Sequence, residues 1–192
     1  MRNETDITAD ILAAEDRGET PGLLEPLLIG ETSRHRGALT DLALELAQKA
    51  VGFRRSLPES LRTSLAGLVR GMNCYYSNLI EGHNTHPIDI ERALKNDYSK
   101  DARKRDLQLE AKAHITVQEW IDLGGLKGRT ATSDGIRETH YRFCELLPDD
   151  LLWVEDPATK ERIKVVAGEL WHRDVVVGAH IAVSPGAVPR FL

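Results

Sequence analysis

The sequence predicts a mainly helical fold: a helical bundle with a small β-hairpin flap near the C-terminus. Apolar residues recur at helical spacing over most of residues 33–147, and Val- and Ile-rich segments follow only after about residue 150. With 192 residues, 41% of them hydrophobic and 29% charged, the chain is long enough to bury the core of one domain. We expect a polar N-terminal arm over residues 1–32 and a helical domain over residues 33–192.

Prolines, a glycine and a capping serine bound the first three expected helices. Ser33 can cap a helix over about residues 34–55. Pro58 fits the first turn of a second helix, whose wide apolar stripe predicts burial between neighbouring elements. That helix ends at Gly82, because glycine adopts the left-handed conformation of a helix stop without strain. Pro87 opens the third helix.

Two more helices and a flap complete the predicted order. The fourth helix covers about residues 105–123 and ends at two glycines, and Ser133 can cap a fifth that reaches about residue 147. The following segments are short and rich in Val and Ile, which is typical of strands and predicts a hairpin or a three-stranded flap over about residues 150–180. These segments are 151–155, 161–167 and 173–179.

Composition and charge exclude several classes of protein. The net charge of −5 and the pI near 5.8 offer no footprint for nucleic acid. Cys74 and Cys144 are too few for a disulfide framework, so we expect free thiols and a reducing compartment. The acidic N-terminus does not fit a signal peptide, and no apolar run reaches the roughly 18–20 residues of a membrane span. The sequence therefore predicts a cytoplasmic protein without a membrane partner.

Two clusters of metal- or phosphate-binding residue types fit structural roles better. His83 and His86 flank Glu81, but a fourth ligand and an outer shell that would make a zinc site are not evident. The glycines near Lys127 and Arg129 lack the spacing of a phosphate-binding loop and favour a helix stop. We therefore predict no metal site.

Other histidines and basic residues also favour structural roles. His114 and His140 lie within helical patterns, where packed and hydrogen-bonded histidines are the commoner case. The basic run is interleaved with aspartates, which indicates a solvated helical face. Its members are Lys100, Arg103, Lys104 and Arg105.

The stretch MNCYYSNLIEGHNTHP, residues 72–87, carries the strongest candidate site. Ser77 and Glu81 are four residues apart and share one helix face, and Gly82 follows directly. A carboxylate near a helix C-terminus is unfavourable by roughly 0.3–1 kcal/mol unless a cation neutralises it. Glu81 therefore calls for a positively charged partner.

With its flanks, this stretch resembles the Fic family, whose enzymes transfer AMP from ATP to hydroxyl groups of target proteins. YYSNLIEGHNT is similar to the family's inhibitory-helix motif [ST]-x-x-x-E-[GN]. LQLEAKAHITVQEWI and ETHYRFCELLP resemble helices of the family, and AGELWHRDVVVGAHIAVSPGAVPRFL resembles its flap hairpin and proline-rich exit. The similarity covers about residues 60–192 in the family's order.

The resemblance implies a regulatory role for Ser77, Glu81 and Gly82. In the family, the inhibitory glutamate forms a strong, charge-assisted contact with an arginine of the ATP-binding loop. This contact displaces the γ-phosphate of ATP. Ser77 would support that geometry from one turn away. The resemblance further implies that the flap docks a target protein by strand addition. Its expected edge is Val175, Val176, Val177 and Gly178.

The chain departs from the family at its catalytic loop. The pattern H-x-F-x-[DE]-G-N-G-R-x-x-R does not occur in the sequence. HYRF at residues 140–143 is not followed by the acidic residue, Gly, Asn and Gly of that loop. We therefore expect no catalytic residue and no bound cofactor in this chain, which is expected to be inactive as the N-terminal part of a longer protein. ATP and Mg²⁺ would belong only to that longer adenylyltransferase.

The sequence leaves two alternative functions and the oligomeric state open. The chain could act in trans as an antitoxin-like binding module that offers Glu81 to a separate Fic core. It could instead be a plain helical interaction domain, in which Ser77 and Glu81 only cap and solvate a helix end. Association into a homo-oligomer is compatible with either.

Overall fold

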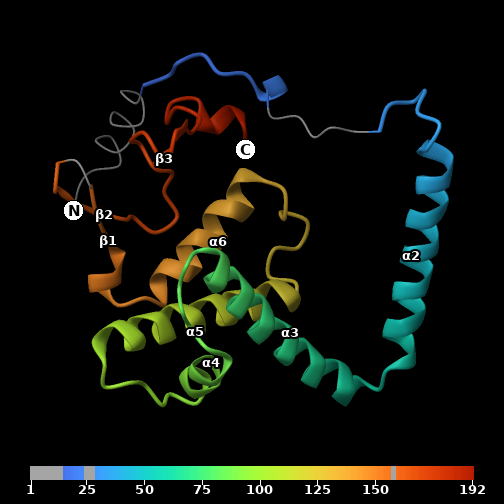
Figure 1. The fold of residues 1–192 in the computed structure, drawn as a ribbon, viewed down its shortest axis with the longest axis horizontal. Coiled ribbons are helices and arrows are strands. Elements are labelled where there is room, and N and C mark those ends of the chain that lie inside the picture. Colours follow the sequence, from blue (N-terminus) through green and yellow to red (C-terminus); the bar gives the residue numbers. More distant parts are fainter. Residues whose placement is uncertain (1–14, 24–28, 157–158) are drawn as a thin grey trace.

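A computed structural model describes residues 15–23, 29–156 and 159–192 (Figure 1). This part of the chain is mainly helical, with two small antiparallel sheets near the C-terminus, as the sequence predicts. The α-helices are α2 (Arg36–Ser56), α3 (Glu59–Ile80), α4 (Pro87–Leu94), α5 (Ala102–Asp122) and α6 (Ser133–Glu145). The strands are β1 (Trp153–Glu155), β2 (Arg162–Lys164), β3 (Val176–Val177) and β4 (His180–Ile181). Short 3₁₀ turns cover Pro21–Leu23, Asp149–Leu152 and Val188–Arg190.

The helix stops and the proline start follow the sequence, whereas two predicted caps were wrong by one or two residues. Pro87 occupies the first turn of α4, and Gly82 has a left-handed φ of 76° directly after α3. The N-cap of α2 is His35 instead of Ser33, because α2 begins at Arg36. Thr132 caps α6, since its hydroxyl accepts a hydrogen bond from the Gly135 amide at 3.1 Å.

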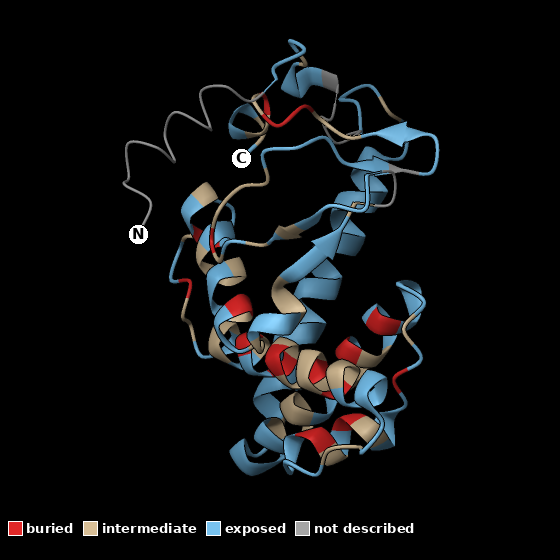
Figure 2. Cartoon of the chain, turned by 90° about the vertical axis from the view of Figure 1, so that its left-hand side faces the viewer, coloured by how far each residue is buried: buried red, intermediate tan, exposed pale blue. Residues whose placement is uncertain are grey.

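The core lies where α3, α4 and α5 meet. Its buried residues come from all three helices, and Figure 2 shows buried residues along these helices and a separate buried stretch in the C-terminal segment. They are Cys74, Ile90, Ala111 and Ile115. Small side chains on α5 let the helices approach closely. Helix α6 packs on α5 beside this core.

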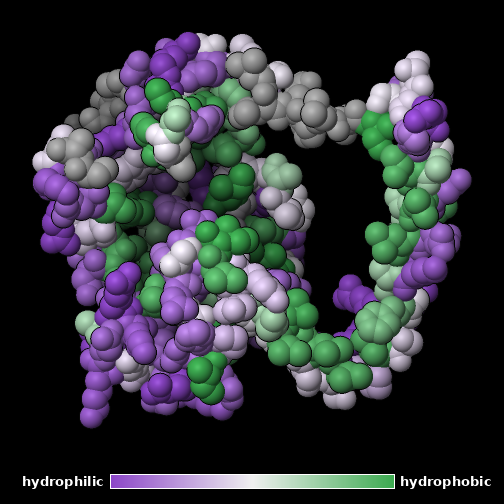
Figure 3. Space-filling model, viewed as in Figure 1, coloured by the Kyte–Doolittle hydropathy of each residue, from purple (hydrophilic) through white to green (hydrophobic). Residues whose placement is uncertain are grey.

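The expectation that the second helix is buried between neighbours was wrong. Within α3 only Cys74 and Asn78 are buried, because the first half of the helix extends beyond α4 and α5 (Figure 1). Helix α2 is even more exposed than α3, because it has no buried residue. It stands apart from the rest of the chain, with hydrophobic residues along the side that faces the body across an open gap (Figure 3).

The flap region forms two separate hairpins, which confirms the predicted β-hairpin, whereas the alternative of one three-stranded sheet is not found among the described residues. Within the described part of the chain, strand β1 pairs only with β2, with Val154 opposite Ile163. Strand β3 pairs with β4, the segment just after the predicted third strand, with Val176 opposite Ile181. A tight turn at Gly178, with φ of 62°, joins β3 directly to β4. This pairing therefore needs a shorter connection than a pairing of β3 with β1 or β2 would.

Two further properties concern thiols and membranes. Cys74 and Cys144 are both free, as the sequence predicts, and both are buried. In the part of the chain that the structure describes, no helix combines the length and the apolar character that crossing a membrane requires.

Candidate functional site

The candidate site at the end of α3 is fixed by a set of backbone hydrogen bonds. Glu81 is the C-cap, and its amide donates to the Ser77 carbonyl at 3.1 Å. The Gly82 amide donates to Leu79 at 3.2 Å and the His83 amide to Asn78 at 2.7 Å, which satisfies carbonyls that a helix end leaves free. The sequence correctly placed the helix stop, and the backbone around Glu81 is well defined.

A buried polar pair that the sequence did not indicate holds the loop after Glu81. Asn78 donates from Nδ2 to the Thr85 hydroxyl at 3.2 Å, and both side chains are buried. Buried polar groups need such partners, so the contact ties residues 82–86 back to α3. The only sequence signal was an asparagine inside an otherwise apolar helical face.

Ser77 and Glu81 themselves are exposed on the surface. Among the described residues, neither side chain forms a hydrogen bond or an ion pair. Glu81 therefore presents a carboxylate at the negative end of a helix, where the helix dipole disfavours it. The backbone that carries this side chain is fixed, and the carboxylate is open to a cation from another molecule or another segment.

The neighbouring histidines do not gather into a metal centre. His83 faces Glu110 of α5, with 3.8 Å between its Nδ1 and the carboxylate, and His86 is the exposed N-cap of α4. Over the described residues, no group of three or more His, Cys, Asp or Glu side chains is arranged to hold a metal ion.

The predicted docking edge lies on the second hairpin. Val175 and Val176 are exposed, and Gly178 lies in the turn to β4. Because β3 pairs only with β4 within the described residues, its other edge carries unpaired backbone groups. Such an edge can accept an extended peptide as an added strand.

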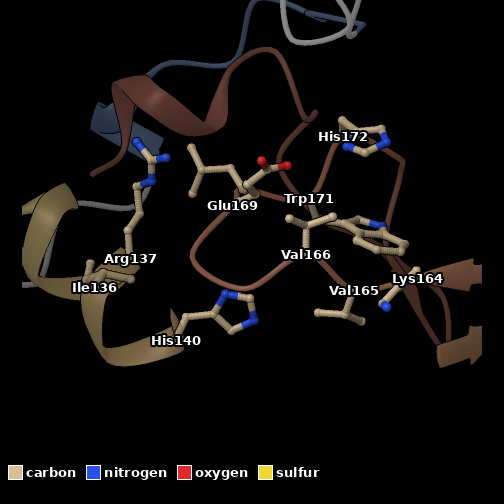
Figure 4. Close-up of a pocket in the computed structure, with 10 residues that line it drawn as sticks. Ile136, Arg137, His140, Lys164, Val165, Val166, Glu169, Trp171 and His172 are labelled. Carbon is tan, nitrogen blue, oxygen red and sulfur yellow. The ribbon is translucent and has the colours of Figure 1, made fainter. Parts of the chain in front are cut away.

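A hollow of about 300 Å³ lies between α6 and residues 164–172. Figure 4 shows side chains of α6 on one side of it and those of residues 164–172 on the other. Arg137 donates from Nε to the Gly168 carbonyl at 2.8 Å, and the Gly168 amide donates to Nδ1 of His140 at 3.0 Å. Gly168 has φ of 75°, so these contacts clamp a left-handed glycine onto α6.

His140 also contacts Cys144, but the pair is not arranged for nucleophilic catalysis. Nε2 of His140 lies 3.3 Å from the Cys144 sulfur. Since Nδ1 accepts the Gly168 amide proton, neutral His140 carries its own proton on Nε2 and donates toward the sulfur. It cannot take the thiol proton, and burial raises the pKa of Cys144. The predicted role of His140 as a packed, hydrogen-bonded histidine is confirmed.

The described part of the N-terminal arm is bound to the C-terminal segment. Residues 1–14 and 24–28 of the predicted arm lie outside the described residues. Glu19 accepts hydrogen bonds from the amide and the hydroxyl of buried Ser184, at 2.9 and 2.6 Å, which holds the pKa of Glu19 at about 2. Arg190 binds Asp16 and lowers the pKa of that carboxyl to about 2. Arg17 reaches Asp174 at 2.6 Å.

Comparison of the chain with protein-family models, with curated proteins and with solved structures finds no match. The resemblance to the Fic family therefore rests on the sequence motifs alone, and the function that it implies stays a prediction.

Proposed function

We propose that this chain is a regulatory and target-docking module of Fic-type protein adenylylation, autoinhibitory through Ser77 and Glu81. The transfer of AMP would be carried out by a catalytic loop outside these 192 residues. In this role Glu81 binds an arginine of the ATP-binding loop and displaces the γ-phosphate of ATP. The hairpin of β3 and β4 binds the target protein.

The observation that carries the proposal is the position of Glu81. Glu81 is the C-cap residue of α3, and its carboxylate is exposed and has no partner among the described residues, while Gly82 and the pair of Asn78 and Thr85 fix the backbone around it. A carboxylate in an unfavourable place on a fixed backbone is suited to receive a guanidinium from elsewhere. The exposed position of the candidate residue thus agrees with a brake that acts on an arginine outside the chain.

The second hairpin is consistent with the docking half of the proposal. The free edge of β3 offers backbone hydrogen bonds, which bind an extended segment with little regard for its side chains. Exposed Val175 and Val176 flank that edge and provide apolar contacts.

The test is to titrate the full chain into a Fic catalytic core that has its own loop but no inhibitory helix. Transfer of labelled AMP from ATP should fall as the chain is added, and the chain alone should transfer none. Glu81→Gln removes the charge but keeps the shape, and the loss of a charge-assisted hydrogen bond of about 1.5–3 kcal/mol should weaken inhibition at least about tenfold.

Glu59→Gln, an exposed carboxylate in the first turn of the same helix, is the matched control and should inhibit like the unchanged chain. Transfer by the chain alone would contradict the assignment of catalysis to other residues. If neither the unchanged chain nor the control inhibits at saturation, the chain does not act on Fic cores in trans.

The plain interaction domain is distinguished by the same experiment. In that case Glu81 only solvates a helix end, so Glu81→Gln and Glu59→Gln should behave identically in every assay. A covalent fusion of the chain to the catalytic core separates regulation within one protein from regulation in trans, because only the former requires the connection.

A further inference from the structure

Helix α2 carries an apolar face that nothing in the described chain covers. Leu39, Leu42, Leu46 and Phe53 are three, four and seven residues apart, so they lie on one side of the helix. All four are exposed, and Leu46 and Phe53 are exposed by 69% and 65%. An apolar stripe of this kind is stable when it is packed against another surface.

A groove of about 460 Å³ between α3 and α4 is equally unfilled. Its floor includes Gly67 and Gly71, one helical turn apart, and a Cβ added to either would meet no atom within 4 Å. Exposed Leu68 and Ile88 line its sides. Glycines at this spacing allow the backbone of another helix to approach closely, so the groove suits a helix.

The charges of the helix and the groove are complementary. Helix α2 carries the basic residues Arg36, Lys49, Arg54 and Arg55 against the acidic residues Asp41 and Glu45. Arg54, beside the apolar face, makes no ion pair within the described residues. Among the residues that line the groove, Glu91 is the one charged side chain, and it is exposed and bound to Lys95 at 2.6 Å. Arg54 of α2 is therefore opposite in sign to the single charge of the groove lining.

The connection between α2 and α3 keeps the helix away from its own body. Leu57 and Pro58 both have extended backbone, with ψ of 131° and 150°. Proline fixes this direction, because its ring restricts φ. Short connections of this type favour the exchange of an element between identical chains.

We propose that two copies of this chain form a dimer by exchanging α2, with α2 of each copy docked in the groove between α3 and α4 of the other. This arrangement covers both uncovered surfaces at once and closes with twofold symmetry, whereas pairing of α2 with α2 would leave both grooves open. The inference goes beyond the proposed function and does not depend on it.

Light scattering coupled to gel filtration tests the dimer with the full chain. The unchanged chain should show twice its mass of 21.4 kDa, falling toward 21.4 kDa on dilution. Leu42→Glu with Leu46→Glu places two charges on the apolar face of α2, and Gly67→Gln with Gly71→Gln fills the groove. Each double variant should be monomeric. Glutamine favours a helix more than glycine does, so the groove variant should keep its fold, which circular dichroism checks.

Mixing the two double variants is the decisive step. The groove variant still has an intact α2 and the helix variant an intact groove, so the mixture should form a heterodimer with one intact interface. Leu44→Gln with Val51→Gln, on the opposite side of α2, is the control and should remain dimeric.

Three results would overturn the proposal. The first is a mass of 21.4 kDa for the unchanged chain at every concentration. The second is a groove variant that stays dimeric, which would mean that α2 binds α2. The third is a mixture of two folded monomeric variants that remains monomeric.

Discussion

Helices α2 and α5 have the same length and the same number of large apolar residues, yet one is exposed throughout and the other forms the centre of the core. Each has 21 residues. The large apolar residues of α2 are Leu39, Leu42, Leu44, Leu46, Val51 and Phe53. Those of α5 are Leu107, Leu109, Ile115, Val117, Trp120 and Ile121. The apolar content of a helix therefore does not decide whether it is buried.

The difference lies in neighbours and in small residues. Helix α5 packs against α3, α4 and α6, and Ala111 and Ala113 let those helices come close. It also buries a polar side chain, Gln108, that is bound at both ends. Helix α2 also contains alanines, but among the described residues no neighbouring helix packs against them. Burial requires two surfaces that pack against each other. Within the part of the chain that the structure describes, α2 provides one such surface and no other element packs against it.

The largest expected effect is a direct test of this contrast. Ile115→Ala in α5 removes a buried side chain of the core and should lower the free energy of unfolding by about 2–5 kcal/mol. Leu44→Ala in α2, on the side away from the proposed interface, should change it by no more than about 0.5 kcal/mol. Urea unfolding at low protein concentration measures both. Equal losses would mean that α2 is packed as tightly as α5.

A smaller effect is expected from a comparison of one glutamine in each of these helices. Gln108 accepts the Ser99 amide at 2.7 Å and donates to the Asp89 and Asp97 carbonyls, so Gln108→Leu leaves buried polar groups unpaired. The expected cost is about 2–3 kcal/mol. Gln48→Leu on α2 is the matched exchange at an exposed position and should be nearly neutral. If the two variants unfold at the same urea concentration, Gln108 does not hold α4 and α5 together.

Periodicity and chain-breaking residues predicted the elements of this fold, because they act locally. Gly82 ends α3 and Pro87 starts α4 as expected, and the position of Glu81 at a helix end follows from its two neighbours. The charged run after residue 99 also lies on an exposed surface, as predicted.

Contacts between distant residues could not be predicted in this way. Nothing local links Glu19 to Ser184, which are 165 residues apart. The stripe of α3 predicted burial, but the pattern of one helix does not tell how far its neighbours extend. The small β-hairpin flap was predicted correctly, but its division into two hairpins was not, since Val-rich segments show where strands lie and not which segments pair. For the candidate site, the sequence predicted Glu81 but not Asn78 and Thr85, which hold its loop.

The smallest expected effect concerns the pH dependence of α5. Burial lowers the pKa of His114 below its ordinary value of 6.5, and Glu110 only partly opposes this shift. The unfolded chain therefore binds the proton more readily, so the stability contributed by neutral His114 is complete above pH 6.5 and is lost as the pH falls through the lowered pKa. His114→Gln should flatten the loss of stability below pH 6.5, measured by urea unfolding at several pH values. His86→Gln, at the exposed N-cap of α4, is the control and should keep the unchanged profile. A profile that His114→Gln leaves unaltered would place the acid sensitivity of the core elsewhere.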